Sequence, residues 1–169
     1  SISGNFKKAL IQKNAFASIS SLTNITFEGE IQLETDTFQE NNHLKTVDFS
    51  KADMQQIPLY CFHKCHDLES ILLPSNLEII GDQAFFNTQL KEITFPSTLK
   101  ILRDKAFYGS SLTNITFADN ESFIEEIGNG AFIGNHLTSL PPDIISKCKK
   151  IGEEAFGANR FVELTLIAP

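Results

Sequence analysis

A short stretch at residues 61–66, Cys-Phe-His-Lys-Cys-His, concentrates residue types that bind metals and transfer protons. Thiolate and imidazole are the usual ligands of zinc, so this stretch is consistent with half of a zinc site. The alternative interpretation is that Cys61 and Cys65 are packed, unreactive side chains. Their place in the repeating pattern of the chain favours the second interpretation.

The four histidines, His43, His63, His66 and His136, raise the question of acid-base catalysis, because imidazole changes charge near neutral pH. Three of them lie four or five residues after a phenylalanine, in a turn, and no carboxylate or nucleophile recurs beside them at a fixed offset. No nucleophile elbow, phosphate-binding glycine loop or zinc-protease motif occurs in the sequence. We therefore expect surface turn histidines, no enzymatic activity, no catalytic residue, no cofactor and no bound metal.

A phenylalanine preceded by a small residue recurs along the whole chain. The seven pairs are Ala15-Phe16, Thr37-Phe38, Cys61-Phe62, Ala84-Phe85, Ala106-Phe107, Ala131-Phe132 and Ala155-Phe156. Their intervals of 22, 24, 23, 22, 25 and 24 residues are typical of a solenoid in which each coil contributes one supersecondary unit. The phenylalanines are expected to fill the interior of successive coils.

A second block of six residues starts five or six residues after each phenylalanine. The blocks are Leu-Thr-Asn-Ile-Thr-Phe at 22–27, then 44–49, 68–73, 90–95, 112–117, 137–142 and 161–166. Their first, fourth and sixth positions are apolar apart from Pro142, whereas the third and fifth are mostly polar. Since side chains alternate between the two faces of an extended chain, each block predicts a short strand with Ile and Phe inward and Thr outward.

Two further positions repeat with the phenylalanine. An apolar residue precedes it by five positions, from Ile11 to Ile151, and Gly81, Gly128 and Gly152 follow that residue at what we interpret as a bend. Three positions after the phenylalanine the coils carry small or turn-bonding residues such as Asn41 and Ser110, and Cys65 occupies this position in the third coil. Cys61 takes the place of the small residue before the phenylalanine.

The composition bounds the possible functions. The chain has 169 residues, 41% of them hydrophobic, which is the size of one ordinary domain, and no apolar run long enough for a membrane span. A net charge of −7 without a strong basic cluster argues against nucleic acid as a partner. Three cysteines are too few for a disulfide framework, so packing must stabilise the fold.

Residues 68–85 and 90–107 show the pattern L-x-x-I-x-F/L-P-x-x-L-x-x-I-G-x-x-A-F most clearly. This pattern resembles the BspA-like leucine-rich repeats, and the resemblance covers essentially residues 1–169, a single domain. It implies a leucine-rich-repeat solenoid of about seven coils of 22–25 residues, conventionally an α/β fold made mostly of short strands and turns, with a parallel sheet on its concave side. Members of this family are often surface or secreted proteins associated with adhesion.

The sixth coil departs from the pattern, because its block ends in Pro141 and Pro142. Proline cannot donate to a sheet ladder, so a shortened strand is expected there. Ile144 and Ile145 add apolar residues that the repeat does not accommodate. Three glycosylation sequons begin at Asn24, Asn114 and Asn120, and we interpret them as incidental unless the protein is secreted by a eukaryote.

The outward positions of the blocks form two parallel rows that we call the sheet face. The third positions are Asn24, Thr46, Ser70, Glu92, Asn114, Ser139 and Glu163, and the fifth positions are Thr26, Asp48, Leu72, Thr94, Thr116, Pro141 and Thr165. One interpretation is that Thr simply favours exposed strands. The other is that this hydroxyl-rich, uncharged-to-acidic sheet binds a protein, with Leu72 as an apolar anchor.

The sequence thus predicts a non-enzymatic recognition or adhesion module at a cell surface or outside the cell, with a protein ligand and without nucleic-acid binding or membrane insertion. The alternative is a structural spacer or self-assembling segment of a larger protein. The chain starts within a coil and ends after a block, without an obvious polar capping unit at either end. We therefore expect a fragment of a longer array, or self-association through uncovered ends.

Overall fold

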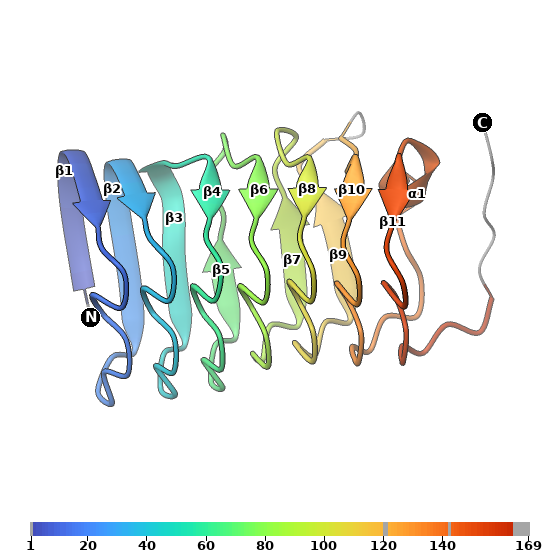
Figure 1. The fold of residues 1–169 in the computed structure, drawn as a ribbon, viewed down its shortest axis with the longest axis horizontal. Helices are drawn as coiled ribbons and strands as arrows, with labels where there is room; N and C mark the ends of the chain where they lie inside the picture. The colour runs from blue at the N-terminus through green and yellow to red at the C-terminus, as the bar shows by residue number, and fades with distance from the viewer. Residues whose placement is uncertain (1, 120–121, 142, 164–169) are drawn as a thin grey trace.

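The computed structural model describes residues 2–119, 122–141 and 143–163, which form a parallel β-solenoid. Figure 1 shows the coils following one another along the long axis of the molecule, with their turns at one border. The leucine-rich-repeat solenoid expected from the sequence is confirmed.

The strand blocks form one side of the solenoid. A four-stranded parallel sheet has the order β1 (Ile2–Ile11), β2 (Asn24–Leu33), β3 (Thr46–Asp53) and β5 (Ser70–Leu72). β7 (Glu92–Phe95) and β9 (Asn114–Phe117) continue the same row as a separate two-stranded sheet. The register advances by one repeat per coil, as in the pairing of Thr46 with Asn24 and with Ser70.

The second side is a ladder of two-residue strands. β4 (Gln56–Ile57), β6 (Ile79–Ile80), β8 (Ile101–Leu102), β10 (Glu126–Ile127) and β11 (Lys150–Ile151) form one continuous five-stranded parallel sheet. These strands carry the apolar residue that precedes each phenylalanine by five positions. Of the five, Ile57, Ile80, Leu102 and Ile127 are buried, whereas Ile151 is exposed.

The phenylalanines form a continuous stack through the core. Rings from Phe16 to Phe156 lie nearly parallel in neighbouring coils, with centroids 5.0–5.5 Å apart. In six of the coils the backbone N–H of the phenylalanine donates to the carbonyl of the small residue before the next phenylalanine, as from Phe62 to Ala84 at 2.8 Å. The small residue therefore lets two coils approach closely enough for both the ring contact and the hydrogen bond.

Each corner turns through two left-handed residues, placed two positions before and two positions after the phenylalanine. In the third coil these are Tyr60 and Lys64, with φ of 57° and 58°. The other members are Asn14, Ser18, Asp36, Glu40, Gln83, Asn87, Lys105, Gly109, Gly130, Gly134, Glu154 and Ala158. Most of these residues carry a side chain, although the left-handed region favours glycine.

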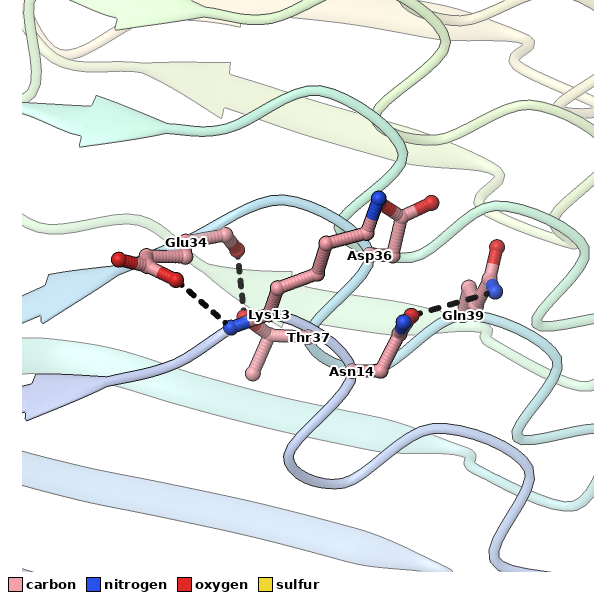
Figure 2. Close-up of polar contacts among 6 residues, drawn as sticks. All are labelled: Lys13, Asn14, Glu34, Asp36, Thr37 and Gln39. Carbon is pink, nitrogen blue, oxygen red and sulfur yellow. Dashed lines mark hydrogen bonds and ion pairs between the residues drawn. The ribbon is translucent and has the colours of Figure 1, made fainter.

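Polar side chains hold the first two corners together. Figure 2 shows the backbone N–H of Lys13 donating to Glu34 Oε2 at 2.9 Å and the amide of Gln39 reaching Asn14 Oδ1 at 3.5 Å. Lys13 Nζ also lies 3.6 Å from a carboxylate oxygen of Asp36, which is largely buried. Because these groups bond to one another across the coils, they stabilise the corners and do not form a free site.

At Gly81, one of the repeated glycines that we interpret as residues of a bend, the structure shows a packing reason for glycine. A Cβ built there would lie 2.6 Å from the backbone nitrogen of Leu59 and 2.7 Å from the carbonyl carbon of Pro58. Gly81 is therefore required by the close approach of the preceding coil, and a left-handed φ is absent at this position.

Several strands also differ from expectation. β1 and β2 are ten residues long because the block strand continues into the segment that forms separate short strands in later coils, whereas β3, with eight residues, ends before the separate β4. β1 pairs with β2 from Ile2 onward, so an additional strand precedes the first predicted block. In the sixth coil the described residues 137–141 form no strand, and α1 (Asp143–Ser146) follows, with Ile144 fully buried.

Candidate protein-binding face

The cysteines of residues 61–66 are packed in the core. Both Cys61 and Cys65 are fully buried, and Cys65 Sγ lies 3.1 Å from the carbonyl oxygen of Phe38, to which it donates. Burial raises the pKa of Cys61 well above its ordinary value and raises the pKa of Cys65 to about 12. Since the thiolate is the form that binds metals and attacks electrophiles, neither thiol is prepared for that chemistry near neutral pH.

The position of Cys65 belongs to a ladder of polar residues in the core. Asn41, Asn135 and Asn159 each donate from Nδ2 to the phenylalanine carbonyl of their own coil and of the preceding coil, at 2.7–2.9 Å. Ser110 and Thr88 donate to the carbonyl of Phe85 from the same position. The prediction of small or turn-bonding residues at this position is confirmed.

His43, His63 and His66 each contact a different partner. His43 Nδ1 lies 3.2 Å from Asp67 Oδ2, and His66 Nδ1 lies 3.2 Å from the carbonyl oxygen of Asn87, both in exposed turns. His63 is half-buried and stacks on Phe86 with ring centroids 4.9 Å apart. Across residues 2–119, 122–141 and 143–163, no group of three His, Cys, Asp or Glu side chains could hold a metal ion.

In the first five blocks the strands form the sheet face as the sequence predicts. Third-position side chains on these strands are all exposed, from Asn24 on β2 to Asn114 on β9. The inward partners Ile25, Phe27, Ile93 and Phe95 are buried, which confirms the alternation. Leu72 on β5 is 53% exposed among polar neighbours.

Some residues of the sheet face bond to one another. Thr46 Oγ1 donates to Asn24 Oδ1 at 2.6 Å, and the hydroxyls of Thr94 and Thr116 lie 2.9 Å apart. Asp48 Oδ1 accepts from both the hydroxyl and the backbone N–H of Ser50, at 2.7 and 2.9 Å. These bonds lower the pKa of Asp48, so its carboxylate remains ionised at neutral pH.

The last two blocks do not extend the sheet in the described part of the chain. Ser139 and Pro141 precede α1 without a strand, and their place in the two rows is therefore wrong as a sheet position. Two prolines remove the backbone donors that a ladder there would need. Glu163 is exposed but lies outside any strand, and Thr165 lies outside the described residues.

Sequence reasoning missed a groove in the sheet face. It lies between β5 and β7, has a volume of about 330 Å³, and is open to solvent. Its lining comprises Ser50, Ile71, Leu72, Leu73, Ser75, Glu92, Ile93, Thr94, Pro96 and Ala118. One signal was visible in the sequence: Leu73 stands where the first, second, fourth and fifth blocks end in phenylalanine.

A comparison with protein families agrees with this architecture. The model of the BspA type leucine-rich-repeat region matches in six copies, over residues 2–112 and 79–167. A crystal structure of a leucine-rich repeat protein from Bacteroides ovatus aligns with 22% identity and a TM-score of 0.42, covering 90% of this chain and 58% of that chain. Among curated proteins no match is found. No helix of the described residues is long and apolar enough to cross a membrane.

Proposed function

The chain belongs to the BspA-type leucine-rich-repeat family, and on this premise we propose that it is a non-enzymatic recognition module whose sheet face binds a protein, with adhesion at a cell surface as its setting. Leucine-rich-repeat solenoids supply rigid, extended surfaces for binding. The surface and adhesion setting is supported by the family alone.

One observation carries this proposal: the outward side chains of β2, β3, β5, β7 and β9 form two rows along two successive hydrogen-bonded parallel sheets. The rows combine hydroxyl and amide groups with a single large exposed apolar residue, Leu72. An apolar residue surrounded by hydrogen-bonding groups is the usual anatomy of a protein interface. A surface of this shape suits a macromolecule better than an enclosed small substrate.

The proposal is tested by single substitutions on the sheet face. The immobilised wild-type chain is incubated with native cell-surface proteins, and bound proteins are quantified by mass spectrometry. Thr94→Arg and Thr116→Arg place a long charged side chain on the face and should each abolish capture of the protein that the wild type retains. Their melting temperatures should stay close to that of the wild type, because both threonines are exposed.

Gln56→Arg is the matched control, because Gln56 is exposed on β4, in the other sheet. It adds the same charge and should leave capture unchanged. If all three variants lose the partner equally, the loss reflects charge and the assignment of the face is wrong. If the two threonine variants bind as the wild type does, the sheet face is not the binding surface.

A further inference from the structure

The sheet that carries the proposed binding face is interrupted at a single junction between described strands of the block row. No β-ladder joins β5 to β7, although β3 pairs with β5 and β7 pairs with β9. The other side of the solenoid is continuous at the same junction, because β4, β6 and β8 pair without a gap. The core is also continuous, with Phe62 and Phe85 stacked at 5.4 Å. The groove therefore sits in a rigid frame.

Two changes in the sequence coincide with this interruption. In the first three coils the block starts six residues after the phenylalanine, as from Phe62 to Leu68, whereas from Phe85 to Leu90 and onward it starts five residues after it. Because this turn is one residue shorter, the block of the fourth coil starts one residue closer to its phenylalanine than the block of the third coil does. At the same junction the second aromatic row of the core lacks a ring, because Leu73 stands between Phe49 and Phe95.

Backbone polar groups of β7 point into the gap. The ladder to β9 uses alternate residues of β7, since Ala118 N donates to the carbonyl of Phe95 at 2.9 Å and Asn114 N donates to the carbonyl of Lys91. The intervening residues Glu92 and Thr94 therefore direct their N–H and C=O groups toward β5. These groups face the groove, which gives its apolar lining a polar wall.

The residues that line the groove favour binding of an apolar side chain of the partner. Leu72 and Leu73 from β5 and its following residue meet Pro96 and Ala118 from the next two coils. Burying the exposed part of Leu72 against a partner would remove apolar surface from water, which is the main source of affinity at such positions. A volume of about 330 Å³ accommodates one or two side chains and lies at the lower end of the range of small-molecule pockets.

The charges near the groove indicate which residue type should lie next to that side chain in the partner. Among the described residues that line the groove, Glu92 is the one with a charge, and none is Lys, Arg or His. Asp48, ionised and held by Ser50, is the register partner of Leu72 on β3. Leu72 therefore has one carboxylate beside it on β3 and a second in the lining of the groove, in a chain of net charge −7. A partner with a cation beside its apolar group is complementary to this arrangement.

We propose that the groove between β5 and β7 anchors the protein partner by binding an apolar side chain that is flanked by Lys or Arg in the partner's segment. This inference rests on the proposed function of the sheet face and adds to it the site and the chemistry of the contact. The observation that carries it is the coincidence, in one gap of the sheet, of an exposed leucine, strand-edge groups outside any β-ladder and two carboxylates.

The test is an NMR titration of the ¹⁵N-labelled chain with the blocked tripeptide Arg-Phe-Arg. We expect the shifts to cluster at residues 70–75 and 92–96, with a Kd on the order of 1 mM for so short a ligand. The peptide Glu-Phe-Glu should bind at least about fivefold more weakly at low ionic strength. The peptide Arg-Gly-Arg lacks the apolar side chain and should leave the groove resonances unshifted at equal concentration.

Two variants localise the binding. Leu72→Lys should abolish it, whereas Leu10→Lys is the matched control, because Leu10 is 55% exposed on β1, remote in sequence from the groove. Leu73→Phe restores the aromatic row, fills the floor of the groove without changing charge, and should also abolish binding while retaining the fold. Equal binding by Leu72→Lys and Leu10→Lys would overturn the inference.

The other outcomes separate this inference from the proposed function. Equal affinities for the three peptides, or unshifted groove resonances at saturating Arg-Phe-Arg, overturn the groove as the anchor. If the shifts instead map to Asn24, Thr26 and Asn114, the sheet face stands as the binding surface and the groove falls. Loss of partner capture in Thr116→Arg together with full capture in Leu73→Phe leads to the same conclusion.

Discussion

Asn135 donates a hydrogen bond from Nδ2 to the carbonyl oxygen of Phe107, 2.7 Å away in the preceding coil. The same amide group donates to the carbonyl of Phe132 in its own coil at 2.9 Å, and its Oδ1 accepts from the backbone N–H of Leu112 at 2.8 Å. One buried side chain therefore satisfies three backbone groups at the corner where two coils meet. This contact complements the phenylalanine stack, because the stack supplies apolar burial and the amide satisfies the polar atoms beside it.

Asn135→Ala should lower the free energy of unfolding by about 2–3 kcal/mol, because it leaves buried carbonyl and N–H groups without partners. Asn135→Ser should cost less, since Ser110 bonds to a phenylalanine carbonyl from the equivalent position. Urea unfolding followed by circular dichroism measures both. The control is Asn42→Ala at an exposed turn residue, where we expect a change within about 0.5 kcal/mol. Equal losses at positions 135 and 42 would contradict the role of the ladder.

The sequence predicts this position well because its side chains, apart from Ile19 in the first coil, share one physical property. Asn41, Ser110 and Cys65 are all small and able to donate a hydrogen bond, and they recur at a fixed distance from a residue type that is easy to recognise. The strand blocks were predictable for the same reason, since alternation of Ile and Thr reports the two faces of a strand.

Other features leave weaker traces in the sequence. The left-handed corner residues include Tyr60, Gln83 and Lys105, which have no common side-chain property, because their conformation is imposed by the stacked coils. The gap between β5 and β7 coincides with a turn that is one residue shorter and with Leu73 in place of phenylalanine. Differences of this size also occur between other coils of the chain, so they do not stand out in the sequence. The loss of the sixth strand was foreseeable only in part, from its two prolines.

Gly81→Ala should lower the free energy of unfolding by about 1–3 kcal/mol, because its Cβ would overlap backbone atoms of Pro58 and Leu59 and force the two coils apart. Arg103→Ala is the control, since this exposed residue occupies the equivalent position one coil later and already has a Cβ. We expect a change within about 0.5 kcal/mol for that variant. Thermal unfolding of both variants makes the comparison, and a neutral Gly81→Ala would show that the coils can shift apart freely.

His63 should make the protein less stable in mild acid. Burial, with a smaller contribution from Lys64, lowers the pKa of His63 below its ordinary value of 6.5, although Glu40 and Asp36 oppose this and His66 adds to it. The unfolded imidazole therefore takes up a proton near pH 6.5 while the folded one does not, so the free energy of unfolding falls as the pH falls below that value. Its Nδ1 is buried without a hydrogen-bond partner.

His63→Phe should remove this contribution and keep the stack on Phe86. We expect the variant to be more stable than the wild type, and the difference to widen as the pH is lowered from about 7.5 to about 5. Urea unfolding of both proteins at both pH values measures it. A difference that stays constant with pH would show that the folded protein protonates His63 as readily as the unfolded chain does.

Lys105→Gly should leave stability unchanged or raise the free energy of unfolding by up to about 1 kcal/mol, although glycine weakens most ordered positions. Lys105 has a φ of 55°, where an L-residue costs about 1–2 kcal/mol, and glycine avoids this cost. Against that gain stands the larger entropy that glycine loses on folding, about 0.5–1 kcal/mol. Lys45→Gly is the control, because Lys45 is equally exposed but does not have a positive φ, so it should show only the loss. If both variants are destabilised equally in thermal unfolding, the corner residues are not strained and the stacked coils impose no conformational cost on them.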